Sequence, residues 1–200
     1  LTATQIGYLS QTQFSNLVAT QIKALTTSQI AALTTTLITG LSTTQVAALS
    51  TAQILALTTT HVSSMETTDI HALSLVQAKT LRGTQLQSLA ATQVASLTAS
   101  QIAALSATQM RGFNAEHIAA LTTTQVTALT TAQITTLTTI QVGGLSATQI
   151  ATLNTKQIKG LTASQVALLS TEQIGGLQAT DLAVMTTAQL KELTATQVAA

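Results

Sequence analysis

The sequence predicts an all-α protein, a solenoid in which 25 octapeptide repeats each form one short capped helix. All 200 residues divide into octads from Leu1 without an insertion or a deletion. Large apolar side chains recur at positions 1 and 6 of the octad, and a helix-starting signal recurs at positions 2 and 5. An eight-residue period suits neither a continuous helix nor a strand. These observations together define the fold class.

The octad has the consensus L-[ST]-[TA]-T-Q-[IV]-A-A. Position 1 is Leu in 22 octads, and position 6 is apolar in all 25. Position 5 is Gln in 20 octads, and position 2 is Ser or Thr in 18. The octads that lack Gln at position 5 carry Leu37, His61, Asp69, His117 or Asp181 there. Repeats of this regularity are typical of solenoids, in which each unit stacks on its neighbours.

The eight-residue period requires a new helix to begin in every octad. Eight residues of a continuous helix rotate by about 800°, so equivalent positions would drift by about 80° per octad and form no stripe. In a strand, positions 1 and 6 have opposite parity and would face opposite sides of a sheet. A chain of short helices separated by turns avoids both problems.

Each octad carries two devices that start a helix. In residues 121–128, Thr122 and Gln125 form a capping box, and Leu121 and Val126 form a hydrophobic staple around it. The expected helices therefore occupy positions 3–8 of every octad, from residues 3–8 and 11–16 through to 195–200. A six-residue helix is only about 9 Å long and is unstable alone, so the octads must stack.

A second period, twice the length of the octad, suggests how many octads make one coil. Through residue 150, Ile at position 6 falls mainly in odd octads and Val only in even ones, and four of the five Gly residues at position 8 keep one two-octad phase. We expect two octads per coil, with three octads per coil as the alternative. The same pattern would also arise if the gene grew by duplication of units of two octads.

We expect one continuous domain over residues 1–200, with a degenerate seam at 61–88. Within the seam, Ala78 replaces the staple residue, while Arg82 and Gly83 replace the cap and the first helical residue. Octads 1 and 25 look like interior octads, whereas solenoids normally end in atypical caps. We therefore expect an excerpt of a longer array, with head-to-tail stacking of open ends as the alternative.

Four metal-ligand side chains lie close together in the seam: His61, Glu66, Asp69 and His71. Both His61 and Asp69 occupy position 5, so a helix spacing should separate them, which is too far for one metal ion at about 2 Å from each ligand. Asp at this position also suits the first turn of a helix. We assign no metal-binding residue.

His117 stands beside Glu116, a pair that could move a proton. The sequence places no nucleophile or orienting group beside them, so a tolerated cap variant is the better interpretation. We expect no enzyme, and we assign no catalytic residue, no cofactor-binding residue and no cofactor.

Composition limits the remaining functions. Charged residues make up only 6% of the chain and the net charge is +1, so the basic patch that nucleic acid requires is missing. Polar residues interrupt every apolar run before the length of a membrane span. Thr at positions 3 and 4 should line up on the stacked octads. A regular Thr-rich face that binds ice, carbohydrate or another surface is therefore an alternative function.

The octad L-[ST]-x-x-Q-[IV]-x-x resembles the tandem arrays of very large bacterial secreted or cell-surface proteins of the adhesin-like type. The resemblance covers all 200 residues. It implies a structural stalk, spacer or filament segment that lies outside the cell. The expected partners are neighbouring repeats or further copies of the same array.

Overall fold

The computed structural model describes residues 2–199, and all the regular structure in this range is helical. The chain divides into two compact units, the first ending at Leu97 and the second beginning at Thr98. In both units each octad forms one helix of four to six residues. The predicted all-α solenoid of minimal helices is confirmed.

The first unit contains twelve of the described helices. They are α1 (Ala3–Gly7), α2 (Gln11–Ser15), α3 (Ala19–Lys23), α4 (Thr27–Ala31), α5 (Thr35–Thr39), α6 (Thr43–Ala48), α7 (Thr51–Ala56), α8 (Thr59–Ser64), α9 (Thr67–Ala72), α10 (Leu75–Thr80), α11 (Gly83–Gln87) and α12 (Ala91–Ser96).

The second unit contains the remaining thirteen described helices. They are α13 (Ala99–Ala104), α14 (Ala107–Met110), α15 (Ala115–Ala119), α16 (Thr123–Ala128), α17 (Thr131–Thr136), α18 (Thr139–Gly143), α19 (Ala147–Ala151), α20 (Thr155–Gly160), α21 (Ala163–Ala167), α22 (Thr171–Gly175), α23 (Ala179–Val184), α24 (Thr187–Lys191) and α25 (Ala195–Val198).

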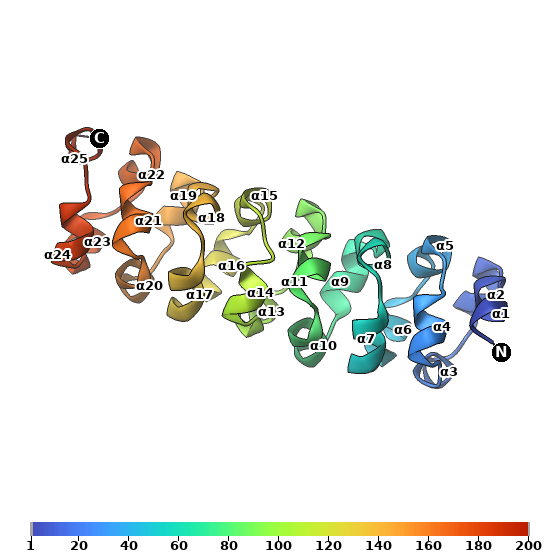
Figure 1. Cartoon of the computed structure of the whole chain (residues 1–200). Coiled ribbons are helices and arrows are strands. Elements are labelled where there is room, and N and C mark those ends of the chain that lie inside the picture. The colour runs from blue at the N-terminus through green and yellow to red at the C-terminus, as the bar shows by residue number, and fades with distance from the viewer. Residues whose placement is uncertain (1, 200) are drawn as a thin grey trace. The chain divides into compact units, whose positions relative to one another are not determined.

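Three octads form one coil. Within the first unit each helix packs against the helix three places along the chain, as α1 does on α4 and α4 on α7, and Figure 1 shows α4 and α7 side by side. Within the second unit, α13 packs on α16 and α17 on α20 in the same way. The expectation of two octads per coil is therefore wrong.

The turn between helices uses positions 1 and 2 of the octad. Leu129 has φ −57° and ψ 132°, and the following Thr130 has φ −74° and ψ 155°. Two successive extended residues redirect the chain at this corner, and three corners complete the coil. The two-octad period of the sequence does not determine the number of octads per coil. Because stacked octads are three places apart, the period makes Ile and Val alternate along a stack, as in Ile102 of α13, Val126 of α16 and Ile150 of α19.

Most of the helices start with the predicted capping box, as α16 shows. The amide N–H of Gln125 donates to Thr122 Oγ1 at 3.2 Å, and Gln125 Oε1 accepts from the N–H of Thr122 at 2.7 Å. The helix interior then begins with the backbone bond from Val126 N to Thr122 O, 2.9 Å. These bonds satisfy amide groups that the first turn of a helix leaves without partners.

The core of each unit is built from positions 1 and 6. The position-6 side chains from Ile6 to Ile174 are almost wholly excluded from solvent, and the position-1 side chains are buried beside them from Leu33 to Leu169. Position 8 packs on the preceding coil. A Cβ on Gly144 would lie 2.5 Å from the carbonyl oxygen of Ala115, so the two backbones approach closely at this point. Small residues at positions 3 and 8 allow this approach.

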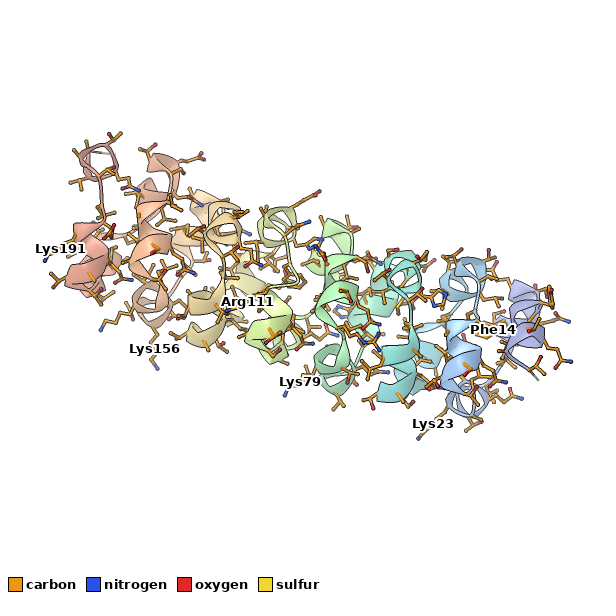
Figure 2. The ribbon with its side chains drawn as sticks, viewed as in Figure 1. Phe14, Lys23, Lys79, Arg111, Lys156 and Lys191 are labelled. Atoms are coloured by element: carbon orange, nitrogen blue, oxygen red, sulfur yellow. The ribbon has the colours of Figure 1, made fainter. Side chains whose placement is uncertain are left out.

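None of the described helices has the length and apolar composition that a bilayer span requires. The lysine and arginine side chains lie on the outside of the units. Figure 2 shows Lys23 in the first unit, and Lys156 and Lys191 in the second, projecting away from the ribbon.

Candidate functional site: a ladder of buried glutamines

The glutamine at position 5 is buried in the interior coils. Gln157 is 1% exposed and Gln133 is 2% exposed, although a glutamine at the third position of a surface helix would face water. One end of each amide serves its own octad. Gln157 Oε1 accepts from the N–H of Asn154 at 2.8 Å, and Gln133 Oε1 accepts from the N–H of Thr130 at 2.8 Å. This half of the amide is the cap that the sequence predicts.

The other half of the amide binds the preceding coil. Gln157 Nε2 donates to the carbonyl oxygens of Val126 at 2.9 Å and Leu129 at 2.7 Å. In the first unit, Gln85 makes the two equivalent bonds at 2.9 Å and 2.8 Å. The acceptors are position 6 of the octad four places earlier and position 1 of the octad three places earlier. They lie at the end of one helix and at the corner that follows it.

One side chain thus satisfies polar groups of two helices in different coils. A helix leaves its first N–H groups and its last carbonyls without internal partners, and a buried group without a partner costs about 1–3 kcal/mol. The amide has one acceptor and one donor end, and it bridges the N-terminus of its own helix and the C-terminus of another. The repeated bridges form a ladder along the coils of each unit.

From the sequence, this glutamine is predicted to have a local role only. The absence of Glu from position 5 is a signal for the second role. A capping box accepts Glu as readily as Gln, and a negative charge there suits the helix dipole. None of the 25 octads has Glu at position 5. A carboxylate could accept from the N-cap amide, but it could not donate to the preceding coil.

Histidine can replace glutamine in the ladder. His61 Nδ1 lies 3.3 Å from the N–H of Thr58, and His61 Nε2 lies 2.9 Å from the carbonyl oxygen of Leu33. The two contacts require a neutral ring with its proton on Nε2. Burial lowers the pKa of His61, which favours that form, while the Leu33 carbonyl acts in the opposite direction.

His117 caps its helix in the same way. Its Nδ1 lies 3.3 Å from the N–H of Asn114, and its own N–H donates to Asn114 Oδ1 at 2.8 Å. The ring packs edge-on against Phe113, with 5.6 Å between ring centroids and 76° between planes. These contacts agree with the interpretation of His117 as a cap variant.

Aspartate fits the ladder poorly. Asp69 is 1% exposed, and its Oδ2 is buried without a hydrogen-bond partner. Burial raises the pKa of Asp69 to about 6, and the neighbouring Glu66 carboxylate adds to the rise. Asp181 accepts from the N–H of Gln178 at 2.9 Å, which is the cap half of the bridge. An aspartate is one methylene shorter than a glutamine, and its carboxylate cannot donate.

The metal-ligand side chains of the seam do not converge. His61 is held between Thr58 and Leu33, whereas His71 Nδ1 lies 2.8 Å from the carbonyl oxygen of Ser96. Across residues 2–199, no three His, Cys, Asp or Glu side chains form a group that could hold a metal ion. The structure therefore brings none of the four candidates together as a site.

A second regular feature is a set of exposed threonines at position 4 in the first unit. Because three octads form one coil, each unit has three sides, and each side is a stack of helices three places apart in the chain. On two sides of this unit, every octad carries Thr at position 4. On one side these are Thr12, Thr36, Thr60 and Thr84, and on the other Thr20, Thr44, Thr68 and Thr92. All eight side chains are exposed.

The fold and the ladder define the class of protein: a tandem-repeat α-solenoid with one capped helix per octad. A family model described as the ALTTAQ repeat matches residues 99–131, 107–139 and 142–179. These matches all fall in the second unit, and each spans about four to five octads. No curated protein matches the chain. The similarity supports the tandem-repeat character of the chain, which the octads of both units show directly.

Proposed function

We propose that the chain is a structural spacer, a stalk or filament segment of a bacterial secreted or cell-surface protein. The Gln ladder carries this proposal, since most interior octads of a unit repeat the same contact with the coil before them. A unit can therefore grow by whole octads without any change in its contacts. The resemblance of the octad to adhesin-like surface arrays supports a position outside the cell. The proposal assigns the chain no catalytic role.

Lengthening the array tests the spacer function. One coil, residues 121–144, can be inserted once, twice or three times after Gly144, and the largest dimension of each purified chain measured by small-angle X-ray scattering. Each inserted coil should add roughly 8–10 Å, the spacing of packed helices. The proposal fails if the added coils leave the largest dimension unchanged, because the chain would then compact rather than extend.

The threonine rows support one alternative, a module that binds ice, carbohydrate or another surface. Eight exposed hydroxyls occupy equivalent positions on two sides of the first unit. Along one side, successive threonines are about one helix spacing apart, roughly 8–10 Å. This is coarser than the roughly 4.8 Å of threonine ladders on sheets, so we place the alternative second.

Thermal hysteresis of the purified chain tests the ice-binding form of the alternative. Activity that disappears when Thr36, Thr60 and Thr84 are changed to Lys would favour binding over a spacer. The same three substitutions at Thr124, Thr148 and Thr196 serve as a control, because these threonines lie in the second unit.

A further inference from the structure

Two residues that depart from the octad consensus line the same hollow on the first unit. Lys23 is at position 7 of its octad, where most residues are small. Val76 is at position 4, where Val76 and Ile140 are the only apolar side chains larger than Ala. Lys23 and Val76 are far apart in the sequence, yet both line a hollow of about 500 Å³. We name it the Lys23 hollow.

Four helices build the Lys23 hollow. Helix α3 packs on α6, and α7 packs on α10. The corner between α6 and α7, at Leu49 and Ser50, also lines the hollow. Gln77 of α10 donates through Nε2 to the carbonyl oxygens of Val46 and Leu49, both at 2.8 Å. This rung of the ladder ties the two stacks of helices together at a hollow whose volume is typical of small-molecule sites.

Part of the Lys23 hollow is apolar. Ala19, Ala47 and Ala48 line it with one-carbon side chains, and Val76 adds two methyl groups. Val76 is 63% exposed, whereas Thr is the usual residue at this octad position. A ligand with an apolar face would remove this surface from water, which favours binding.

Three hydroxyl groups line the same hollow, those of Ser50, Thr51 and Ser74. Ser50 Oγ accepts from the N–H of Gln53 at 3.3 Å. Ser74 Oγ accepts in the same way from the N–H of Gln77 at 3.2 Å. A hydroxyl that accepts still has its own proton to donate. The hollow can therefore form hydrogen bonds with hydroxyl groups of a ligand.

Lys23 supplies a positive charge to the hollow. Its side chain projects away from the ribbon (Figure 2), and its ammonium group has no hydrogen-bond or ion-pair partner among the described residues. The acidic residues of the first unit are Glu66 and Asp69, and neither lines the hollow. A ligand carboxylate would thus meet a cation that no carboxylate of the protein neutralises, and charged hydrogen bonds of this kind are the stronger ones.

We propose that the Lys23 hollow binds a uronate, a six-carbon sugar in which C6 is a carboxylate. The carboxylate accepts from Lys23 Nζ, and the ring hydroxyls form hydrogen bonds with the three hydroxyl groups of the hollow. The apolar C–H groups of the ring cover the alanines and Val76. A neutral sugar leaves Lys23 without a partner, and a simple carboxylate leaves the hydroxyl groups and the apolar surface uncovered. This binding function goes beyond the proposed spacer function and does not depend on it.

Binding should also stabilise the irregular segment 73–88. Helix α10 begins this segment and contributes Ser74, Val76 and Gln77 to the hollow, whereas the other lining residues belong to α3, α6, α7 and the corner between α6 and α7. A bound uronate touches α10 and these earlier helices together. Opening of α10 then breaks the contacts with the ligand, so it requires more free energy.

Titration with sodium glucuronate, followed by NMR of ¹³C-labelled valine methyl groups, tests the proposal. The Val76 signals are assigned from their loss in Val76→Thr. They should shift and saturate at millimolar glucuronate, whereas the signals of Val126 and Val166 in the second unit should not shift. Glucose and sodium acetate, at matched concentration and ionic strength, should bind at least threefold more weakly. Equal binding of either control ligand would overturn the proposal, as would the absence of a saturable shift at Val76.

Two variants that each remove one positive charge separate the site from an effect of total charge. Lys23→Gln should weaken glucuronate binding about three- to fivefold, the range of an ion pair near a protein surface. Lys156→Gln removes an exposed lysine of the second unit and should bind glucuronate like the unchanged chain. Both lysines are exposed, so neither variant should change the circular dichroism spectrum. Equal loss of binding in the two variants would contradict the assigned site.

Amide hydrogen exchange with and without saturating glucuronate tests the effect on α10. Exchange across residues 73–80 should be at least threefold slower with the ligand, and exchange across residues 121–136 of the second unit should not change. Equal slowing of both segments, or no slowing at 73–80, would overturn the inference. The lengthening of the chain by inserted coils does not involve this hollow, so failure here would leave the spacer function standing.

Discussion

Glutamine at position 5 satisfies polar groups at the ends of two helices that belong to different coils. A cap alone contributes about 1 kcal/mol, which is the cost expected if the amide served only its own octad. Burial changes that expectation. Loss of the side chain also leaves the position-1 carbonyl of the preceding coil without a donor, and such a group costs about 1–3 kcal/mol.

Gln157→Ala should therefore destabilise the second unit by about 2–4 kcal/mol, the sum of a lost cap and one unsatisfied carbonyl, that of Leu129, because Val126 O keeps its bond from Leu129 N. Urea unfolding followed by circular dichroism measures the change. Gln21→Ala is the matched control, because Gln21 caps its helix but donates to no described residue, and it should cost only about 1 kcal/mol. Equal costs at both positions would show that the contact between coils contributes nothing.

Asp69 should make stability depend on pH. Its pKa lies at about 6, above the ordinary 3.8, so the folded state holds the proton more tightly than the unfolded state. The resulting stability is fully present below pH 3.8 and is lost as the pH rises through about 6. His61 acts in the opposite sense, since its lowered pKa gives stability above pH 6.5 that is lost as the pH falls.

Asp69→Gln should raise the free energy of unfolding at pH 8 by about 1–3 kcal/mol, because it restores a donor where a buried oxygen has no partner. The gain should be smaller at pH 4, where Asp69 is protonated. His61 is present in both proteins, so its contribution cancels in the difference. Asp69→Asn, which is too short for the full bridge, is the control for charge alone. A gain that is the same at both pH values would contradict the raised pKa.

At the scale of the element, each helix is too short to be stable alone. Helices of four to six residues lie well below the roughly 12–15 residues that an isolated helix needs. The cap and the staple fix where a helix begins, and the sequence shows both. The side chains at positions 1 and 6 then stabilise it only through contact with other coils. The helices therefore depend on their neighbours more than on their own residues.

The irregular octads within 61–88 form helices α8–α11 in the same arrangement as the others. Two of them lack features that stabilise a typical octad. Arg82 supplies no side-chain cap, and Ala78 places a small side chain at a fully buried core position. Gly83 at the first helical position adds a further entropic cost.

We predict faster amide hydrogen exchange across residues 73–88 than across residues 41–56, which have regular caps and larger core residues. Local opening requires less free energy where packing and capping are weaker. Ala78→Ile with Arg82→Thr should slow exchange in this segment toward the rate of the comparison segment. Uniform protection of both segments in the unchanged chain would contradict the prediction of a seam.

At the scale of the whole molecule, the interior octads that carry Gln at position 5 are equivalent because each makes its contacts at the same two places in the coil before it. These places are position 6 four octads earlier and position 1 three octads earlier, as Gln157 shows with Val126 and Leu129. With three octads per coil, every third octad stacks on the same side of a unit. Any octad can therefore occupy any of the three sides, provided that the eight-residue spacing is kept.

Deletion of one whole octad, residues 145–152, should leave the second unit folded, with a change in the free energy of unfolding close to that of one repeat. Deletion of only residues 149–152 should unfold at least one coil, because every later glutamine is then half an octad out of step with its acceptors. Circular dichroism and urea unfolding compare the two. Similar stability of both deletions would show that the ladder spacing does not govern the fold.

The sequence by itself determined where each helix begins, which two positions form the core, and that the units must stack. These properties are local, because the capping box and the staple lie within one octad. Residues such as Thr122, Gln125 and Val126 show them directly.

The tertiary structure decided the number of octads in a coil and the second role of the glutamine. Both depend on how far the chain turns at positions 1 and 2, and on which carbonyls that turn brings to the amide. The two-octad alternation of Ile and Val suggested two octads per coil. In the structure, Ile and Val alternate along a stack of helices, and this alternation does not determine the angle of the turn between helices. A contact between octads three or four places apart cannot be recognised within a single octad. The one sign of it in the sequence is that Glu, which matches Gln in length but cannot donate, never occupies position 5.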